Sequence, residues 1–193
     1  MTKKIILIFA FIFSLQGFSQ EEYLGDGPYS QLIIRGVMLI NGDGSPPRGP
    51  MDIVVEQNKI VSMQIVGYPG VEINESRRPK LKSGGEELDA NGMYLLPGFI
   101  DMHGHIGGKA QGASPEYVFK LWMAHGITSV KQPSGINAIE LKKQSATNKI
   151  VAPRIFEYTG FGSGSKNPIV TPEDAREWVR MNAKNGADGI KFF

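Results

Sequence analysis

The chain has 193 residues and a formal net charge of +2, with 41% hydrophobic and 21% charged residues, a composition typical of globular proteins rather than disordered or fibrous ones. It contains no cysteine, which excludes disulfide frameworks, thiolate metal sites and thiol nucleophiles. Lys and Arg number 21 against 19 Asp and Glu, with no long basic run, so charge gives no case for nucleic acid or an anionic membrane surface as a partner.

Residues 1–19 have the layout of a secretory signal peptide. Two lysines precede an unbroken apolar run from Ile5 to Phe13, and the small residues Gly17 and Ser19 precede the expected cleavage site. The run is shorter than the roughly 20 residues of a spanning helix, so no stable membrane anchor is expected, with an uncleaved anchor as the alternative. We therefore expect an exported protein, periplasmic or extracellular, that starts at Gln20.

Residues 20–93 are rich in predicted strands. Three apolar runs predict strands, at residues 32–40, 51–56 and 60–66. A short polar turn separates the last two runs, which is typical of a hairpin. This part of the chain is therefore expected to form a small β domain.

The third run predicts a half-buried strand. Its apolar residues Val61, Met63 and Ile65 alternate with polar ones, so one face should be buried and the other wet. The following stretch, residues 67–87, is polar, charged and glycine-rich, and predicts an extended surface loop in contact with solvent.

Residues 94–193 alternate predicted strands with predicted helices. Strands are expected at residues 95–101, 127–130, 154–158 and 189–193, and helices from Ser114 and Pro115 to Gly126, over about 136–146, and from Thr171 to Gly186. Strands and helices in alternation, joined by short connections, imply right-handed parallel βαβ units. The fold class is therefore α/β, either an open doubly wound sheet or part of a (β/α)8 barrel.

The first and third of these helices each have a start signal and an apolar stripe. Serine or threonine followed by proline is typical of a helix N-terminus, and Asp174 completes a capping box in the third helix. The expected buried stripes are Val118, Leu121 and Trp122 in the first helix, and Ala175, Trp178, Val179 and Ala183 in the third.

Two of the three histidines, His103 and His105, are separated by one residue at the carboxyl end of the strand predicted at 95–101. Residues two apart on an extended strand point the same way, and the carboxyl ends of parallel strands carry the sites of α/β enzymes. Two converging imidazoles suit Zn²⁺ or a similar divalent metal. Asp101 lies on the same side, where its carboxylate could accept a hydrogen bond from a ring N–H of a metal-bound imidazole and so fix the tautomer and orientation of that ring.

For two other features a structural role is favoured over metal or phosphate binding. His125 directly precedes the helix-ending Gly126, so a role in ending the helix is favoured over metal binding. The glycine-rich stretch 159–165 lacks the spacing of a phosphate-binding loop, and we expect a flexible loop at the barrel mouth.

The segment Leu96-Pro97-Gly98-Phe99-Ile100-Asp101-Met102-His103-Gly104-His105 resembles the first barrel strand of the metal-dependent amidohydrolase superfamily. The stretch from Pro172 to Lys191, with Gly186-Ala187-Asp188-Gly189-Ile190-Lys191, is most similar to its imidazolonepropionase-like and prolidase-like branch. The resemblance implies a small β-sandwich domain over residues 20–93, followed by the first four βα units of a barrel over 94–193.

The resemblance also implies a metal site made of His103, His105 and Lys191. In such a site Lys191 is carbamylated and bridges two metals, and Asp101 does not bind the metal but hydrogen-bonds one of the ligands. An ammonium has no lone pair for a cation, whereas its CO2 adduct is an anion with two oxygens. The implied cofactor is one or two divalent ions, zinc above all. The implied substrate is a small amide, cyclic amide or dipeptide, and a homo-oligomer is compatible with this picture.

This sequence departs from the family after its second barrel strand. Relatives have Val-Arg-Asp there, whereas Val130 is followed by Lys131 and Gln132, which points to a different substrate group. Relatives also take two more histidines and a catalytic aspartate from strands five, six and eight, so no catalytic residue is expected before Phe193.

Three readings of the function remain. The leading one is the N-terminal part of an exported binuclear amidohydrolase that cleaves carbon–nitrogen bonds with a metal-activated water. The second is a truncated, non-catalytic half-barrel or interaction fragment. The third, a flavodoxin-like open sheet, lacks a glycine-rich nucleotide turn and leaves the two histidines unexplained.

Overall fold

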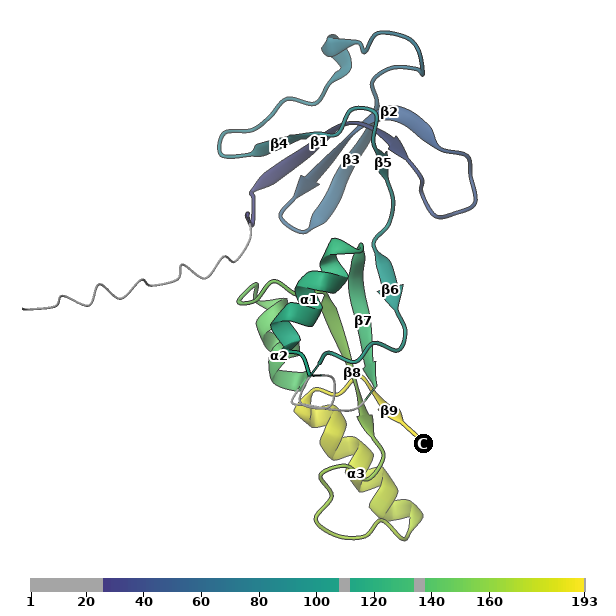
Figure 1. Cartoon of the computed structure of the whole chain (residues 1–193), viewed down its shortest axis with the longest axis vertical. Helices are drawn as coiled ribbons and strands as arrows, with labels where there is room; N and C mark the ends of the chain where they lie inside the picture. Colours follow the sequence, from purple (N-terminus) through teal and green to yellow (C-terminus); the bar gives the residue numbers. More distant parts are fainter. Residues whose placement is uncertain (1–25, 108–111, 134–137, 193) are drawn as a thin grey trace, which may run out of the picture.

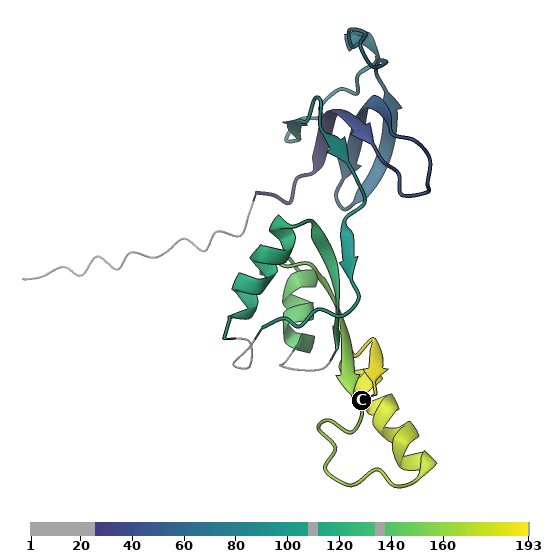
Figure 2. The same ribbon diagram turned by 45° about the vertical axis from the view of Figure 1, so that its right-hand side comes forward.

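The computed structural model describes residues 26–107, 112–133 and 138–192. The expected signal peptide, the cleavage before Gln20, the start of the second helix and Phe193 lie outside these residues. A mixed five-stranded sheet comes first, and a four-stranded parallel sheet with three helices follows it (Figures 1 and 2). Among the described helices, none is long and apolar enough to cross a membrane.

The first sheet is built around its longest strands. Its strands are β1 (Gln31–Leu39), β2 (Arg48–Glu56), β3 (Lys59–Ile65), β4 (Glu86–Asp89) and β5 (Tyr94–Leu95). β2 pairs antiparallel with β1 and with β3, as the hairpin prediction required, while β4 and β5 run parallel to β1. One face carries a small core, formed by Val37, Leu39, Met51, Ile53 and Ala90.

The expected burial of β3 is wrong. Its alternating apolar side chains, Val61, Met63 and Ile65, are 54%, 52% and 44% exposed. The alternation does predict the strand, because it places these side chains on one face. Nothing in the described residues covers that face, since the core of this sheet lies over β1 and β2.

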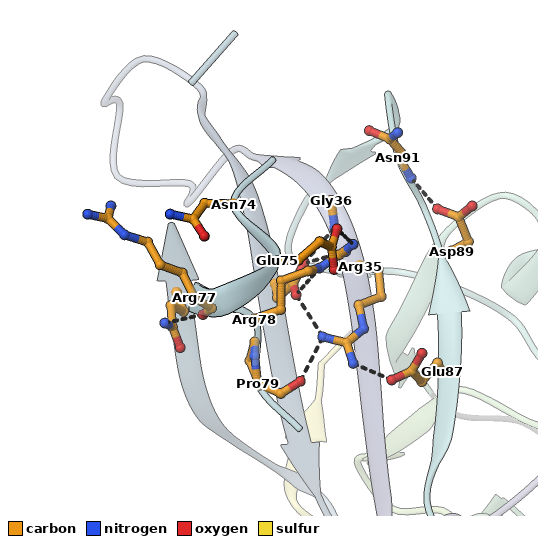
Figure 3. A network of polar contacts seen from close by, with 12 residues as sticks. Arg35, Gly36, Asn74, Glu75, Arg77, Arg78, Pro79, Glu87, Asp89 and Asn91 are labelled. Atoms are coloured by element: carbon orange, nitrogen blue, oxygen red, sulfur yellow. Dashed lines mark hydrogen bonds and ion pairs between the residues drawn. The ribbon is translucent and has the colours of Figure 1, made fainter. Parts of the chain in front are cut away.

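A buried carboxylate on this sheet forms hydrogen bonds with the loop 67–85, and the sequence analysis did not predict this contact. Asp52 on β2 has no solvent exposure, and its Oδ2 accepts hydrogen bonds from Arg35 Nη1 at 2.8 Å and Arg78 Nε at 2.9 Å. Its Oδ1 accepts from the Gly36 N–H at 2.9 Å and from Arg78 Nη2 at 3.1 Å. The loop is therefore not simply solvated, because Arg78 turns inward beside the short 3-10 helix η1 (Glu75–Arg77), as Figure 3 shows.

Arg35 joins three parts of the chain in this network. Besides Asp52, it pairs with Glu87 on β4 and donates to the Pro79 carbonyl at 2.9 Å (Figure 3). Burial by itself would raise the pKa of Asp52, but the hydrogen bonds from Arg78 and Arg35 outweigh it and hold that pKa below its usual value. The carboxylate therefore stays charged between its two arginines.

The segment predicted as one buried strand at 95–101 is in fact divided between the two sheets. Leu95 pairs with β1 as part of β5, whereas β6 (Phe99–Asp101) begins the parallel sheet. Phe99 and Ile100 are 58% and 62% exposed, so the expected burial is also wrong. β6 is an edge strand of its sheet, and the described chain covers little of it.

The parallel sheet has the order β6-β7-β8-β9, with β7 (Ile127–Pro133), β8 (Arg154–Gly160) and β9 (Gly189–Lys191). The helices between its strands are α1 (Pro115–Ala124), α2 (Ala138–Ala146) and α3 (Pro172–Asn185). This confirms the predicted alternation of strands and helices. α1 and α2 lie on one face of the sheet, over a core of Ile106, Phe119, Val130, Ala138 and Ile155 (Figure 1).

The helix ends follow the sequence signals. Ser114 caps α1, and Thr171 with Asp174 forms the expected capping box of α3. Gly186 ends α3 in the left-handed region at φ 106°, a conformation that favours glycine.

The predicted apolar stripes are right only in part. Phe119 rather than Leu121 is the fully buried residue of α1. In α3, Trp178 and Asn182 are buried whereas Val179 is 40% exposed and Ala183 is exposed. α3 lies at the end of the sheet (Figures 1 and 2), so it buries one narrow contact rather than a full stripe.

Trp178 makes that contact with the glycine-rich stretch 159–165. Its ring meets Phe161 edge to face at 5.3 Å between centroids, and its Nε1 donates to the Ser163 carbonyl at 3.2 Å. The first residues of this stretch therefore form the end of β8, and the residues after them form a turn that contacts Trp178 of α3.

Candidate metal centre

The two histidines follow β6 instead of lying on it. The strand ends at Asp101, whose Oδ1 accepts a hydrogen bond from the His103 backbone N–H at 2.8 Å. This bond closes a turn that sends the chain across the carboxyl end of the sheet. In the described residues Asp101 has no hydrogen bond to an imidazole, so its contact is with the backbone of a histidine.

The rings of His103 and His105 lie side by side. Their centroids are 5.3 Å apart and their planes meet edge to face at 69°. Both side chains are exposed, whereas the residues that alternate with them, Gly104 and Ile106, are buried. The alternation that was predicted for a strand therefore persists in the turn and places both imidazoles on one side.

Two contacts to β7 fix the backbone of this segment. The Gly104 N–H donates to the Lys131 carbonyl at 3.1 Å, and the Ile106 N–H donates to the buried side-chain oxygen of Gln132 at 3.2 Å. A methyl group on Gly104 would lie 2.5 Å from Val130 Cγ2, so only glycine lets the chain approach β7 this closely. The histidines are thus held by hydrogen bonds on both sides of His105.

Lys191 reaches the histidines from the other edge strand of the sheet. Its Nζ lies 3.5 Å from His103 Nε2, although β9 and β6 are separated by two strands. In a flat sheet three strand spacings amount to about 14 Å. The two long side chains bridge this separation by extending toward each other across the carboxyl end of the sheet.

The donor set fits a divalent metal. Two imidazole nitrogens bound to one tetrahedral zinc at about 2.0–2.1 Å place the ring centroids about 5 Å apart, close to the observed separation of His103 and His105. Within the described ranges no three His, Asp or Glu side chains converge on one point. A third ligand from this part of the chain would have to be Lys191, which binds a cation only after losing its positive charge.

His125 is placed as the sequence predicted. It is the C-cap residue of α1, and its Nδ1 lies 2.7 Å from the Leu121 carbonyl oxygen. The imidazole of His125 is therefore hydrogen-bonded to the end of its own helix.

Glu157 is a buried acid that the sequence analysis did not single out. It lies on the helix side of β8, 5% exposed, and its Oε2 has no hydrogen-bond partner among the described residues. Burial raises the pKa of Glu157, and the Asp188 carboxylate raises it further, to about 7, although Lys142 acts in the opposite direction. Asp188 itself is paired with Lys142 at 2.6 Å. Strand alternation marks position 157 as buried, but the neighbour Asp188 could be located only by strand pairing.

Comparison with known proteins gives a consistent set of relatives. An N-acyl-D-aspartate deacylase from Alcaligenes xylosoxydans xylosoxydans is 29% identical over 175 residues, which cover 88% of this chain and 29% of the deacylase. A dihydroorotase from Thermus aquaticus is 30% identical over 78 residues, or 39% of this chain and 13% of that enzyme. No protein-family model matches the sequence.

A solved structure of a related enzyme is also similar to this chain over most of the length of the chain. A Xaa-Pro dipeptidase with methionine bound in its active site has a TM-score of 0.55 and 26% identity, over 84% of this chain and 47% of the dipeptidase. The chain therefore spans less than half the length of each of these three proteins.

Proposed function

We propose that the protein is a metal-dependent hydrolase of amide-type carbon–nitrogen bonds, in keeping with the similarity of this chain to the N-terminal portion of amidohydrolase-superfamily proteins. The observation that carries the proposal is the approach of Lys191 to the histidine pair. Lys191 on one edge strand contacts His103, and the ring of His103 lies beside that of His105 in the turn after the other edge strand, at the carboxyl end of the parallel sheet.

In this proposal the parallel sheet is the first half of a (β/α)8 barrel, and the first sheet belongs to a small β-sandwich domain. The order β6-β7-β8-β9, with every pair parallel, supports the first assignment. The exposed apolar face of β3 supports the second, because such a face is normally covered by a second sheet.

His103 and His105 would hold one metal ion through their ring nitrogens, and Lys191 would join them as a carbamate. When bound, such ions lower the pKa of a water ligand and polarise the carbonyl of an amide. Asp101, Lys131 and Gln132 keep the two imidazoles in place through the backbone bonds described above. Zinc is the ion that best suits two imidazoles and an anionic oxygen.

The proposed substrates are N-acyl amino acids and dipeptides. The names of the deacylase and the dipeptidase support this class, since both act on an amide beside an amino acid. The apolar stretch Ile5–Phe13 supports action outside the cytoplasm.

The test is hydrolysis by the full-length protein of a panel of N-acyl amino acids and dipeptides, before and after removal of metal with a chelator. We expect turnover of at least one substrate group, loss of that activity on chelation and its return with zinc. Activity that survives complete metal removal would contradict the proposal, as would a full-length protein that binds zinc and hydrolyses none of the panel.

A further inference from the structure

Lys131 presents a cation on the same side of the sheet as the histidines. Its neighbours on β7, Val130 and Gln132, are buried on the helix side, so strand alternation directs Lys131 to the opposite, open face. Its carbonyl accepts the hydrogen bond of Gly104, the residue between the two histidines. The backbone of Lys131 is thus tied directly to the candidate metal centre.

Tyr158 on β8 holds the charged end of this lysine. The Lys131 Nζ lies 4.2 Å from the centroid of the Tyr158 ring, within the range of a cation–π contact. No Asp or Glu side chain of the described ranges pairs with Lys131, whereas other half-buried cations such as Arg35 and Lys142 have carboxylate partners. The ammonium therefore keeps its hydrogen-bonding capacity for another acceptor.

The lysine and tyrosine share their face with Lys191. A Cβ on Gly189 would lie 2.4 Å from Tyr158 Cε1, so Gly189 faces the ring, and residues two apart on β9 point the same way. The ring of Tyr158 thus lies between Lys131 and the strand that carries Lys191. Lys191 in turn contacts His103.

We propose that Lys131, braced by Tyr158, binds a carboxylate of the substrate, so that the enzyme selects amides that carry a negative charge close to the cleaved bond. The inference rests on the proposed function and names its substrate class more closely. A half-buried ammonium without a carboxylate partner gains most from an anionic ligand, because charge-assisted hydrogen bonds are the strongest available to it. A neutral amide offers no comparable partner.

The test compares matched pairs of ligands on the full-length, zinc-loaded protein. The N-acetyl derivatives of alanine, leucine, proline and aspartate, in both enantiomers, are paired with their α-carboxamides, and binding and hydrolysis are measured separately. We expect the acids to bind about 10- to 100-fold more tightly than the carboxamides. Lys131→Met should remove this preference, whereas Lys131→Arg should retain most of it.

Three controls separate this role from a structural one. Lys120→Met, at an exposed lysine of α1 paired with Glu116, should leave the preference intact. Tyr158→Phe keeps the ring and should behave as the wild type, while Tyr158→Leu should weaken the preference. Zinc content should stay unchanged in Lys131→Met.

The outcomes distinguish a failure of the inference from a failure of the proposed function. Selective binding of acids without hydrolysis would support the inference and contradict the proposed function. Hydrolysis of acids and carboxamides with equal KM would overturn the inference alone. Failure to bind any acid, or loss of zinc in Lys131→Met, would also overturn it, the latter by assigning Lys131 to the metal ligands.

Discussion

The buried side chain of Gln132 accepts a hydrogen bond from the Ile106 backbone N–H, so a residue of β7 holds the chain one position beyond His105. Gln132 is 1% exposed, and Ile106 next to the histidine is part of the hydrophobic core. The position of the imidazole is therefore coupled to the packing of α1 and α2 on the sheet.

Replacing Gln132 by leucine should damage both stability and the metal site. The change keeps the apolar packing but leaves the Ile106 N–H without its acceptor, at a cost of about 1–3 kcal/mol in the free energy of unfolding. Urea denaturation and zinc affinity of the full-length protein measure the two effects. Gln144→Leu, at a half-buried glutamine of α2 that donates a hydrogen bond to Glu140, is the matched control; it should leave zinc affinity unchanged and lower stability less than Gln132→Leu does. Wild-type zinc affinity in Gln132→Leu would show that this bond does not position His105.

The network around Asp52 should be a main source of stability in the first sheet. Asp52→Asn keeps the shape but leaves Arg35 and Arg78 without their shared charge, and we expect a loss of about 3–5 kcal/mol at neutral pH. Glu116→Gln, which breaks an exposed pair on α1, should have little effect on the urea midpoint.

This loss should depend on pH in a defined direction. The pKa of Asp52 is lowered in the folded protein, so its stabilising effect is fully present above the ordinary aspartate value near pH 4. It disappears as the pH falls through the lower, folded pKa. Wild type and Asp52→Asn should therefore converge in acid, and a constant difference down to pH 2 would contradict the assignment.

Local signals in the sequence predicted local structure well. The proline and capping residues at Thr171 and Asp174 and the left-handed Gly186 set the bounds of α3, because each acts within one turn of the helix. The spacing of His103 and His105 likewise placed two imidazoles side by side, since the orientation of residues two apart depends on the backbone alone.

Features that depend on distant partners could not be predicted in the same way. The alternation in β3 defines an apolar face but not what covers it, so the predicted burial of Met63 was wrong. The run at 95–101 looks like one strand, yet its two ends pair with different sheets. Arg78 appeared as one charge in a polar loop, because its partner Asp52 lies 26 residues away.

The buried Glu157 should make the protein less stable as the pH rises. Its folded pKa of about 7 lies above the unfolded value, so the folded state holds a proton that the unfolded state has already lost between about pH 4.5 and 7. Stability due to this group is therefore present in acid and lost as the pH rises through 7.

Glu157→Gln removes this dependence while keeping the side-chain shape. The variant should match the wild type near pH 4 and exceed it by up to about 3 kcal/mol at pH 8. Urea midpoints at the two pH values measure this, with Glu177→Gln on the surface of α3 as the control. Equal midpoint differences between wild type and Glu157→Gln at both pH values would show that Glu157 does not titrate in this range.

The most direct test of the metal centre is the zinc content of the full-length protein, measured by elemental analysis for the wild type and for His103→Asn, His105→Asn, Lys191→Met and His125→Gln. If His103, His105 and Lys191 hold the metal, the first three variants should each lose most of the zinc found in the wild type. His125→Gln should retain it, because that imidazole binds the end of α1. Wild-type zinc content in His103→Asn and His105→Asn, or equal loss in all four variants, would contradict the assignment.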